Sequence, residues 1–515
     1  MSLSVDVPDE LGDFLLRPGP ASLLIRGESG TGKSLLSLSL LNLFNGRRTL
    51  LTARAADPDV MARHSGATSR YGTVEVIAPD RTDAPVASGS SSADSSAQGD
   101  SFPSVAYPRF FELALKALGA APPALVVFDS WEALASDPEG VPNGGSGRVP
   151  TRVDLERKLF SAWVKSSAHL VLVSTESDRS QLDYLADATC ALELTELDER
   201  PLRLLRFSKL RGRSGRSMEY PFTVSEGHFR CFAIAPHGYP LQSRRTDPDP
   251  EPNSSTMWPG SQEFATVFGR LPPGGLTLIE ADRAVPLDVV RMLTVPMIAS
   301  ALTSHAVVII APPPSLTPEE LWKPFSDSIS PEAFAEQVFA VVTSGPKDTG
   351  PRWTDAIHPS ELPGPTGFRF VPPRELSTSG GAPRAGPEEF AAQLPDLEAF
   401  LSRSRQNHTR SLSIGYAEGN LAIGRATGFP MDPESYASTL RAYLVGEGAH
   451  GVAIGRPAEP LFDTIRSYAG LHLNLRAYKG RYIIYATRPW SPSYILAIAE
   501  DEAPGMGPYH LVPLT

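Results

Sequence analysis

The stretch Gly27-Glu28-Ser29-Gly30-Thr31-Gly32-Lys33-Ser34 fits the pattern G-x-x-x-x-G-K-[ST]. Before it, residues 22–26 form a short apolar run that predicts a buried parallel strand. After it, residues 35–44 are apolar on nearly all sides, which predicts a helix covered by a sheet, and Asn45-Gly46 would end that helix. A glycine-rich loop between a buried strand and a helix is the setting in which this pattern binds phosphate.

The residue types in this loop suit a nucleotide polyphosphate. The glycines let consecutive backbone N–H groups turn inward, and the helix N-terminus adds positive potential. Lys33 would reach the β- and γ-phosphates, while the Ser34 hydroxyl would hold Mg²⁺. A flexible glycine turn without a ligand is the alternative. The residues expected to bind ATP are Gly27, Glu28, Ser29, Gly30, Thr31, Gly32, Lys33, Ser34 and Leu35.

The composition excludes several classes of protein. The 515 residues favour more than one domain, and 58 acidic against 47 basic side chains argue against a surface that binds nucleic acid or anionic lipid throughout. Cys190 and Cys231 are the only cysteines, so the chain has neither a disulfide framework nor a cysteine zinc site. The first residues lack a signal peptide, and no run of about 18 apolar residues occurs. We therefore expect a cytoplasmic protein without a membrane span.

Residues 1 to about 235 alternate between strand and helix patterns, which predicts an α/β domain with a parallel sheet. Two inserts interrupt this domain. Residues 81–104 are poor in bulky apolar side chains and are predicted to be disordered, and residues 137–150 are predicted to form a loop rich in Pro and Gly. The predicted strands are 22–26, 49–53, 73–78, 124–128, 169–173, 189–194, 202–210, 218–224 and 228–234, and the predicted helices are 35–44, 109–118, 153–167 and 181–186.

A charged, Pro-rich segment at 236–260 predicts a linker, after which residues 261–515 repeat the pattern of the first domain. Shifting the two halves by 254 positions places Ala281 on Gly27, Pro286 on Gly32, Leu287 on Lys33 and Asp288 on Ser34. The strand predicted at 410–416 would correspond to 124–128 but lacks a carboxylate at its end, and further strands are predicted at 471–475, 481–487 and 494–499. We therefore interpret the second half as a degenerate copy that has lost its phosphate ligands.

Polar residues end two of the predicted strands in the first half. Leu125-Val126-Val127-Phe128-Asp129 is an apolar strand that ends in a carboxylate, and Asp129 would orient a Mg²⁺-bound water beside Ser34. A cap on the following helix is the alternative role. The run Val171 to Glu176 supplies a second polar strand end, so Thr175 and Glu176 are weaker candidates, with Glu176 placed among the catalytic residues.

A basic patch surrounds Ser208-Lys209-Leu210-Arg211-Gly212. Lys209 and Arg211 have period-two spacing, so on a strand both would project from one face and could converge on one anion. A solvated strand edge protected by charge is the alternative. The other basic residues of the patch are Arg203, Arg206, Arg213 and Arg216.

The phosphate-binding loop, Phe128-Asp129-Ser130-Trp131, Leu182 to Asp187, and Lys209-Leu210-Arg211-Gly212 followed by Tyr220 to Val224 together resemble the RecA-superfamily ATPases of the KaiC group. Within that group the sequence is most similar to the GvpD family of archaeal gas-vesicle regulators. This resemblance covers residues 15–235 well and the rest loosely. It implies a RecA-like fold that binds ATP and Mg²⁺, and the GvpD likeness implies regulation by contact with another protein. Together with the degenerate second half, this predicts tandem RecA-like domains of which only the first binds nucleotide.

One departure from the KaiC pattern concerns hydrolysis. Relatives end their second strand with paired glutamates that activate the attacking water, whereas Ala55 and Ala56 align there. A missing general base costs typically about 10²- to 10⁴-fold in rate. Glu28 or Glu176 could substitute, and we expect at most a slow ATPase. Lys209 and Arg211 are expected to read the γ-phosphate of a neighbouring RecA-like domain, which would couple ATP to assembly.

Three functions fit these patterns. The first is a regulator in which ATP orders a surface that a partner protein reads. The second is a DNA-handling or RNA-handling motor, which the fold and the basic patch favour but the acidic balance opposes. The third is a scaffold that nucleotide only stabilises. Fold alone does not decide among them.

Overall fold

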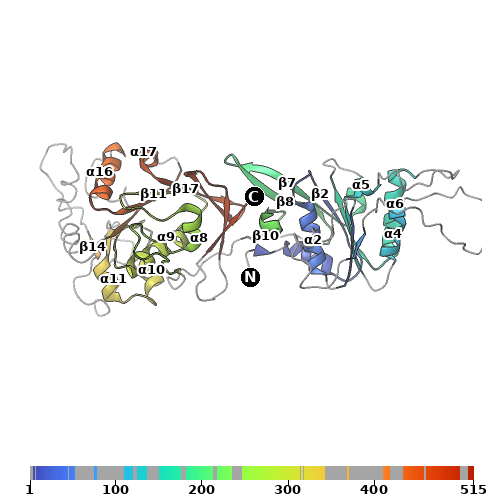
Figure 1. Cartoon of the computed structure of the whole chain (residues 1–515), viewed down its shortest axis with the longest axis horizontal. Coiled ribbons are helices and arrows are strands. Elements are labelled where there is room, and N and C mark those ends of the chain that lie inside the picture. The colour runs from blue at the N-terminus through green and yellow to red at the C-terminus, as the bar shows by residue number, and fades with distance from the viewer. Residues whose placement is uncertain are drawn as a thin grey trace, which may run out of the picture. The chain divides into compact units, whose positions relative to one another are not determined.

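The computed structural model describes most of both halves of the chain, and it divides into two compact units. The main part of the N-terminal unit is Ser4–Ala233, and that of the C-terminal unit is Ile234–Pro513 (Figure 1). The expectations for 53–56, 81–104, 137–149 and Glu176 lie outside the described residues. The described residues are 4–5, 7–44, 46–52, 75–77, 109–119, 124–135, 150–175, 181–212, 217–234, 246–313, 315–316, 318–342, 368–370, 410–417, 433–457, 460–498 and 509–514.

The N-terminal unit is built on a ten-stranded sheet in the order β1-β10-β9-β8-β7-β2-β6-β5-β3-β4. From β7 to β4 neighbouring strands are parallel, and from β7 outward to β1 they are antiparallel. The strands are β1 (Ser4–Val5), β2 (Ser22–Gly27), β3 (Arg47–Thr52), β4 (Glu75–Ile77), β5 (Ala124–Asp129), β6 (His169–Ser174), β7 (Ala188–Leu197), β8 (Arg200–Leu210), β9 (Glu219–Thr223) and β10 (Arg230–Phe232).

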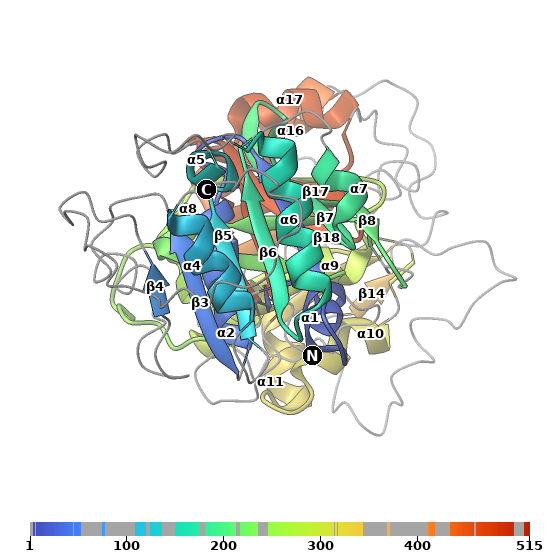
Figure 2. The ribbon, with the colours of Figure 1, turned by 90° about the vertical axis from the view of Figure 1, so that its right-hand side faces the viewer.

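Helices cover both faces of the parallel part of this sheet, because alternate side chains of each strand point to opposite faces. Leu23 and Ile25 pack with α1 (Asp9–Leu16) and α2 (Lys33–Leu43) in one core. Leu24 packs in a second core with the helices of the other face, several of which can be followed in Figure 2. These are α4 (Arg109–Leu118), α5 (Trp131–Ala135), α6 (Arg152–Val164) and α7 (Gln181–Leu185).

The C-terminal unit has its own ten-stranded sheet, in the order β14-β13-β12-β15-β16-β11-β17-β18-β19-β20. Strands from β14 to β17 are parallel to their neighbours, and those from β17 to β20 are antiparallel. They are β11 (Leu276–Ala281), β12 (Val307–Ala311), β13 (Val338–Val342), β14 (Phe368–Phe370), β15 (Ser411–Tyr416), β16 (His450–Gly455), β17 (Leu471–Tyr478), β18 (Arg481–Arg488), β19 (Tyr494–Ile498) and β20 (Tyr509–Pro513).

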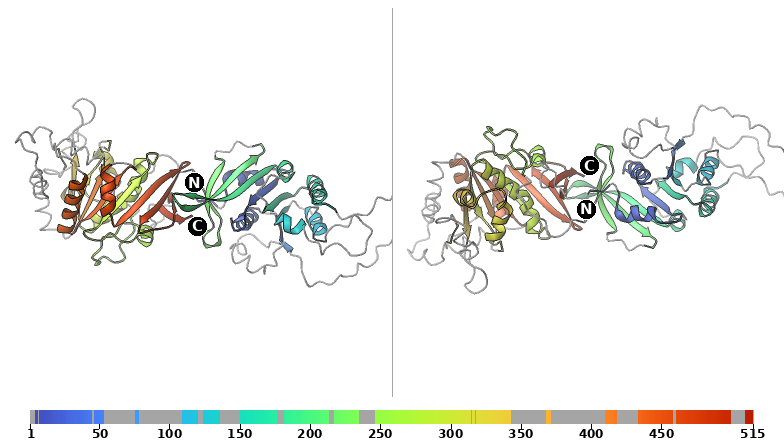
Figure 3. Two further views of the ribbon diagram at one scale, coloured as in Figure 1. Left: turned by 90° about the horizontal axis from the view of Figure 1, so that it is seen from above. Right: turned by 90° about the horizontal axis from the view of Figure 1, so that it is seen from below.

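Helices also cover the C-terminal sheet. α16 (Pro433–Gly446) and α17 (Pro460–Tyr468) pack on β11 and β16 in one core. α9 (Leu287–Thr303) is buried on nearly all sides, and Figures 1 and 3 show it on the opposite side of the sheet from α16 and α17. The other helices are α8 (Gln262–Phe268), α10 (Pro318–Trp322) and α11 (Pro331–Gln337).

The two sheets share one topology. The order β4-β3-β5-β6-β2-β7-β8-β9-β10 of the N-terminal unit corresponds strand by strand to β13-β12-β15-β16-β11-β17-β18-β19-β20. This confirms the predicted tandem of RecA-like α/β domains, and β15 lies in the place of β5, as expected from the sequence. Residues 246–260, expected to belong to a linker, make hydrogen bonds within the C-terminal unit, including an ion pair between Asp249 and Arg270 with a nitrogen-to-oxygen distance of 2.8 Å.

Candidate nucleotide-binding site

The glycine-rich loop lies between β2 and α2, as the sequence predicts, and α2 begins at Lys33. At two positions of the loop, steric crowding leaves no room for a side chain larger than that of glycine. A Cβ at Gly27 would lie 2.5 Å from the Leu192 carbonyl oxygen, and a Cβ at Gly32 would lie 2.8 Å from Val224. Gly32 also has φ 104°, which side chains disfavour. The folded loop therefore requires glycine at both positions.

Lys33 is buried, and its Nζ lies 2.6 Å from the carbonyl oxygens of both Gly27 and Glu28. Glu28, Ser29 and Gly30 are exposed at the tip of the loop, whereas Thr31 is buried. The lysine charge is thus held inside the loop by backbone dipoles. A polyphosphate that bound here would compete with those two carbonyls for the ammonium group.

Asp129 ends β5, and the residue is 3% exposed. Its Oδ2 is buried and has no hydrogen-bond partner among the described residues. β6 pairs in parallel with both β2 and β5, so the loop and Asp129 lie at the same edge of the sheet. A buried, unpartnered carboxylate oxygen favours a cation nearby, so these residues fit Mg²⁺.

The structure adds Glu132, which the sequence reasoning missed. Its carboxylate accepts hydrogen bonds from the Ser174 hydroxyl at 2.5 Å and the Thr175 backbone N–H at 3.1 Å, and it lies 3.7 Å from Arg152. It therefore fixes the end of β6 at the edge that holds Asp129. Its position, three residues after Asp129, was the available sequence signal.

Arg203 on β8 is the second residue that the sequence did not assign to the loop. Its Nη1 donates a hydrogen bond to the Gly30 carbonyl oxygen at 3.0 Å. Arg206, in the same patch, instead pairs with Glu193 at 2.9 Å and Glu219 at 3.1 Å. Among the described residues of the patch, Arg203 is the one that hydrogen-bonds to the phosphate-binding loop.

Lys209 and Arg211 lie at the opposite edge of the sheet. Lys209 pairs with Thr189, which pairs with Leu24, so the lysine lies roughly 10 Å along the strands from Gly27. Its Nζ donates to carbonyl oxygens at the end of α7, those of residue 183 at 2.8 Å, residue 184 at 3.3 Å and residue 186 at 2.5 Å. Burial and the nearby Arg211 lower the pKa of Lys209.

Arg211 lies 3.4 Å from the Asp187 carboxylate, next to the end of α7. The two cations therefore converge, but on the end of a helix of their own unit. They do not reach the loop of that unit, so contact with the γ-phosphate of a neighbouring domain stays a prediction.

In the C-terminal unit, the loop between β11 and α9 has the same length as the phosphate-binding loop, with Leu287 at the start of α9 where Lys33 starts α2. Tyr416 stands at the place of Asp129, since it pairs with Ile454 as Asp129 pairs with Val173. Arg456 Nη1 donates to the carbonyl oxygens of Asp282 at 2.5 Å and Val285 at 3.3 Å. A cavity of about 70 Å³ remains, lined in part by Leu287, Tyr416 and Arg456.

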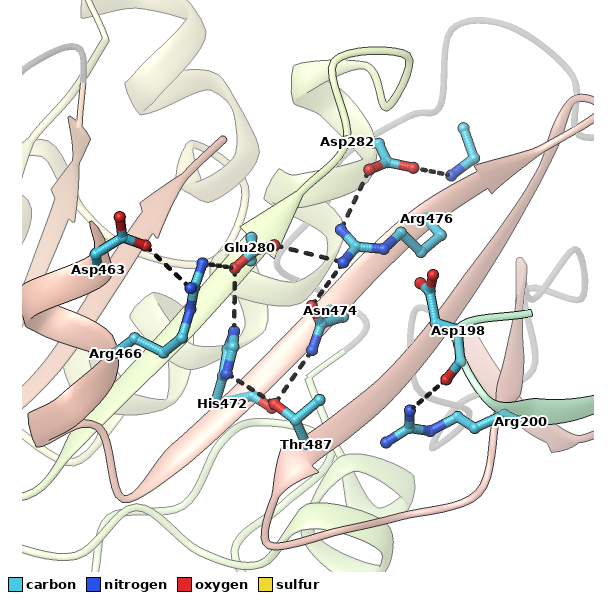
Figure 4. Close-up of polar contacts among 11 residues, drawn as sticks. Asp198, Arg200, Glu280, Asp282, Asp463, Arg466, His472, Asn474, Arg476 and Thr487 are labelled. Carbon is cyan, nitrogen blue, oxygen red and sulfur yellow. Dashed lines mark hydrogen bonds and ion pairs between the residues drawn. The ribbon is translucent and has the colours of Figure 1, made fainter. Parts of the chain in front are cut away.

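A buried ionic network fixes the end of β11 (Figure 4). The Glu280 carboxylate is 2.7 Å from Arg466, 3.3 Å from His472 and 3.4 Å from Arg476. The hydrogen bond with His472, followed by those of the Arg466 guanidinium, lowers the pKa of Glu280 to about 2. Arg476 continues the network to Asp282 at 3.2 Å.

No group of three or more His, Cys, Asp or Glu side chains in the described part of the chain could hold a metal ion by itself. None of the helices described is long and apolar enough to span a bilayer.

The chain matches no family model. It is 26% identical over 392 residues to Protein GvpD2 of Halobacterium salinarum, a match that covers 73% of this chain and 71% of the relative. It is 24% identical over 366 residues to Protein GvpD1 of the same organism, covering 67% of this chain and 64% of that relative. These matches confirm the resemblance to the GvpD proteins that the motifs indicate.

Proposed function

We propose that this chain is a nucleotide-dependent regulatory protein that binds Mg²⁺ and ATP in its N-terminal unit. The observation that carries the proposal is the pairing of a complete phosphate-binding loop with a buried carboxylate oxygen of Asp129 that has no partner among the described residues, at one edge of one sheet. The relationship to GvpD proteins supports it.

The roles of the residues follow from their positions. Backbone N–H groups of the loop and the start of α2 would hold the polyphosphate, and Lys33 would move from the two carbonyls toward it. Ser34 and Asp129 would hold Mg²⁺, which neutralises phosphate charge when bound. Lys33 holds the loop through its contacts with the Gly27 and Glu28 carbonyl oxygens. Nucleotide binding would break these contacts and change the conformation of the loop, and this conformational change is the proposed switch.

Hydrolysis is proposed to be slow. Both Glu132 carboxylate oxygens already accept hydrogen bonds from the end of β6, so Glu132 orients that strand and is poorly placed as a free base. Glu28 is exposed at the loop tip. The KaiC resemblance aligns Ala55 and Ala56 where the water-activating pair is expected.

The regulatory role rests on the GvpD relationship, which implies that another protein reads the nucleotide state. We place the contact with this partner protein in the cytoplasm, and self-association of the chain is measured with the Lys209 variants described in the Discussion. A nucleic-acid motor has less support, because Arg206 and Arg211 of the basic patch are paired with carboxylates of their own unit. Such pairing reduces the charge available to a phosphate backbone.

The test compares the parent chain with Lys33→Ala and, as a matched control, Leu287→Ala at the equivalent position of the C-terminal unit. We expect calorimetry to show one Mg-ATP bound by the parent and by Leu287→Ala, and none by Lys33→Ala. A pull-down from native cells should recover a partner whose amount depends on ATP for the parent and for Leu287→Ala, but not for Lys33→Ala. Equal recovery with and without ATP would instead show a nucleotide-stabilised scaffold.

A further inference from the structure

Arg203 reaches the phosphate-binding loop from outside the parallel sheet. It lies in the antiparallel part, where it pairs with Leu194 on β7 and Phe222 on β9. Its guanidinium is partly buried, and Nη1 lies 3.0 Å from the Gly30 carbonyl oxygen. Its Nε is buried with no hydrogen-bond partner among the described residues.

Simple packing explains this arrangement poorly. A buried N–H of a charged group without a partner costs free energy, and an apolar side chain would fill the same space without that cost. Burial also lowers the pKa of Arg203. This cost is offset if the guanidinium holds the phosphate-binding loop in the conformation that binds the ligand.

We propose that Arg203 is a positioning residue for nucleotide binding, which fixes the Gly30–Thr31 peptide of the loop and so couples the β7–β8 hairpin to the nucleotide. This inference rests on the proposed function. The peptide group is planar, so a cation that holds the Gly30 carbonyl also sets the direction of the Thr31 N–H. Gly30 has φ 82° and no side chain, and the Thr31 N–H also donates to the Glu28 carbonyl oxygen at 3.4 Å, so Arg203 adds a second restraint on this peptide from outside the loop.

The C-terminal unit supplies an internal comparison. Ala477 and Tyr482 pair there as Leu194 and Arg203 pair in the N-terminal unit, so Tyr482 stands where the arginine would be. This correspondence is reliable because both strand pairs carry an irregularity at the same place, between Thr189 and Cys190 and between His472 and Leu473. The arginine is thus present with the intact loop and absent from the degenerate one.

The same comparison separates Arg203 from Lys209. Arg488 pairs with His472 as Lys209 pairs with Thr189, and its Nη1 donates to the carbonyl oxygens of residues 466, 467 and 469 at the end of α17. The basic cap of this helix is therefore kept where no phosphate ligands remain. Arg203, by contrast, is found only in the unit that keeps the phosphate-binding loop, as a residue that serves nucleotide binding would be.

The experiment measures Mg-ATP affinity and the nucleotide-free melting temperature of the full chain for Arg203→Met, Arg203→Lys and the control Arg206→Met. We expect Arg203→Met to weaken binding about tenfold, because the nucleotide must then order a loop tip that the arginine no longer holds, at a cost comparable to one hydrogen bond from a charged donor. Arg203→Lys should recover part of the affinity, and Arg206→Met should bind as the parent does. Hydrogen exchange of β7 and β8 should slow on Mg-ATP binding in the parent but not in Arg203→Met.

The outcomes separate the two proposals. If the parent fails to bind Mg-ATP, the proposed function is wrong and this inference falls with it. If the parent binds and Arg203→Met binds equally well, only the positioning role is overturned. The same holds if Arg203→Met lowers the melting temperature without changing affinity, since the arginine would then serve the fold alone.

Discussion

The N-terminal and C-terminal units are two versions of one fold, and their differences identify which residues the fold needs. Both keep the strand order and a shift in register between the equivalent strand pairs β7–β8 and β17–β18. Both also keep a basic side chain over the end of the preceding helix, which is Lys209 in the first unit and Arg488 in the second. The phosphate-binding loop, Asp129 and Arg203 occur in the first only. Features kept in both units serve the fold, whereas features confined to the first point to a ligand.

An ion pair with exchanged charges makes the same point. Arg26 near the end of β2 pairs with Asp183 on α7 at 2.7 Å, and the equivalent Glu280 near the end of β11 pairs with Arg466 on α17 at 2.7 Å. The sheet and the helix need opposite charges at this junction, but the fold does not determine which side carries which. Removing one partner of a buried pair would leave an uncompensated charge.

The largest expected difference between the units is their response to nucleotide. Mg-ATP at about 1,000 times its Kd should stabilise the N-terminal unit by about 4 kcal/mol, because it binds the folded state alone. The C-terminal unit has Leu287 for Lys33 and Arg456 against its loop, so its stability should not change. Hydrogen exchange, read separately for β2 and β11, checks this. Protection of β11 by bound ATP would contradict the degenerate-copy interpretation.

The buried carboxylate of the C-terminal unit gives the next largest effect. Glu280→Gln should destabilise that unit by about 3 kcal/mol, because Arg466, His472 and Arg476 lose the buried carboxylate they share, and the carboxylates left beside the two arginines, Asp463 and Asp282, are more exposed. Asp463→Asn is the control: Asp463 contacts the same Arg466 but is exposed, so its loss should cost under about 1 kcal/mol. Urea denaturation measures both. Equal costs would show that burial of the Glu280 contacts contributes nothing.

The lowered pKa of Glu280 predicts that the stability of the C-terminal unit depends on pH. The pKa falls from 4.5 to about 2 in the folded state, so this stabilisation is present in full above pH 4.5 and is lost as the pH falls toward 2. The loss amounts to about 3 kcal/mol at 1.36 kcal/mol for each pH unit. Denaturation of the parent and of Glu280→Gln from pH 6 to about 2 tests it; the variant should lose less stability on acidification than the parent.

The two helix caps should give smaller and equal effects. Lys209→Met and Arg488→Met each remove a cation from carbonyl oxygens at a helix end, which should cost about 1–2 kcal/mol. Self-association and ATP hydrolysis then decide whether Lys209 has a second role. If Lys209→Met, and the double variant with Arg211→Ala, lose either property while Arg488→Met keeps both, the γ-phosphate of a neighbour is being read. Equal behaviour would leave the lysine a cap only.

The last expected difference concerns the rate of ATP hydrolysis by the N-terminal unit. We expect steady-state hydrolysis below about 1 s⁻¹, under the usual enzyme range, because no water-activating pair is expected at residues 55–56. A faster rate that disappears in Glu132→Gln would show that Glu132, despite its hydrogen bonds to Ser174 and Thr175, acts as the base.

Sequence alone determined the elements whose signals are local. The loop from Gly27 to Ser34, the strand that ends in Asp129, and the degenerate equivalents Ala281, Pro286 and Leu287 could be placed because glycine, a terminal carboxylate and apolar periodicity act within a few residues. The tandem α/β fold followed from the same repetition.

Tertiary structure alone decided which distant side chains meet. Arg203 lies about 170 positions from Gly30 in the chain, and its place at the loop depends on how β8 pairs with β7 and β7 with β2. The same pairing carries Lys209 and Arg211 to the other edge of the sheet, although period-two spacing alone would suit a phosphate equally well. Side-chain spacing fixes the face of a strand, but only strand register fixes the edge at which a charge lies.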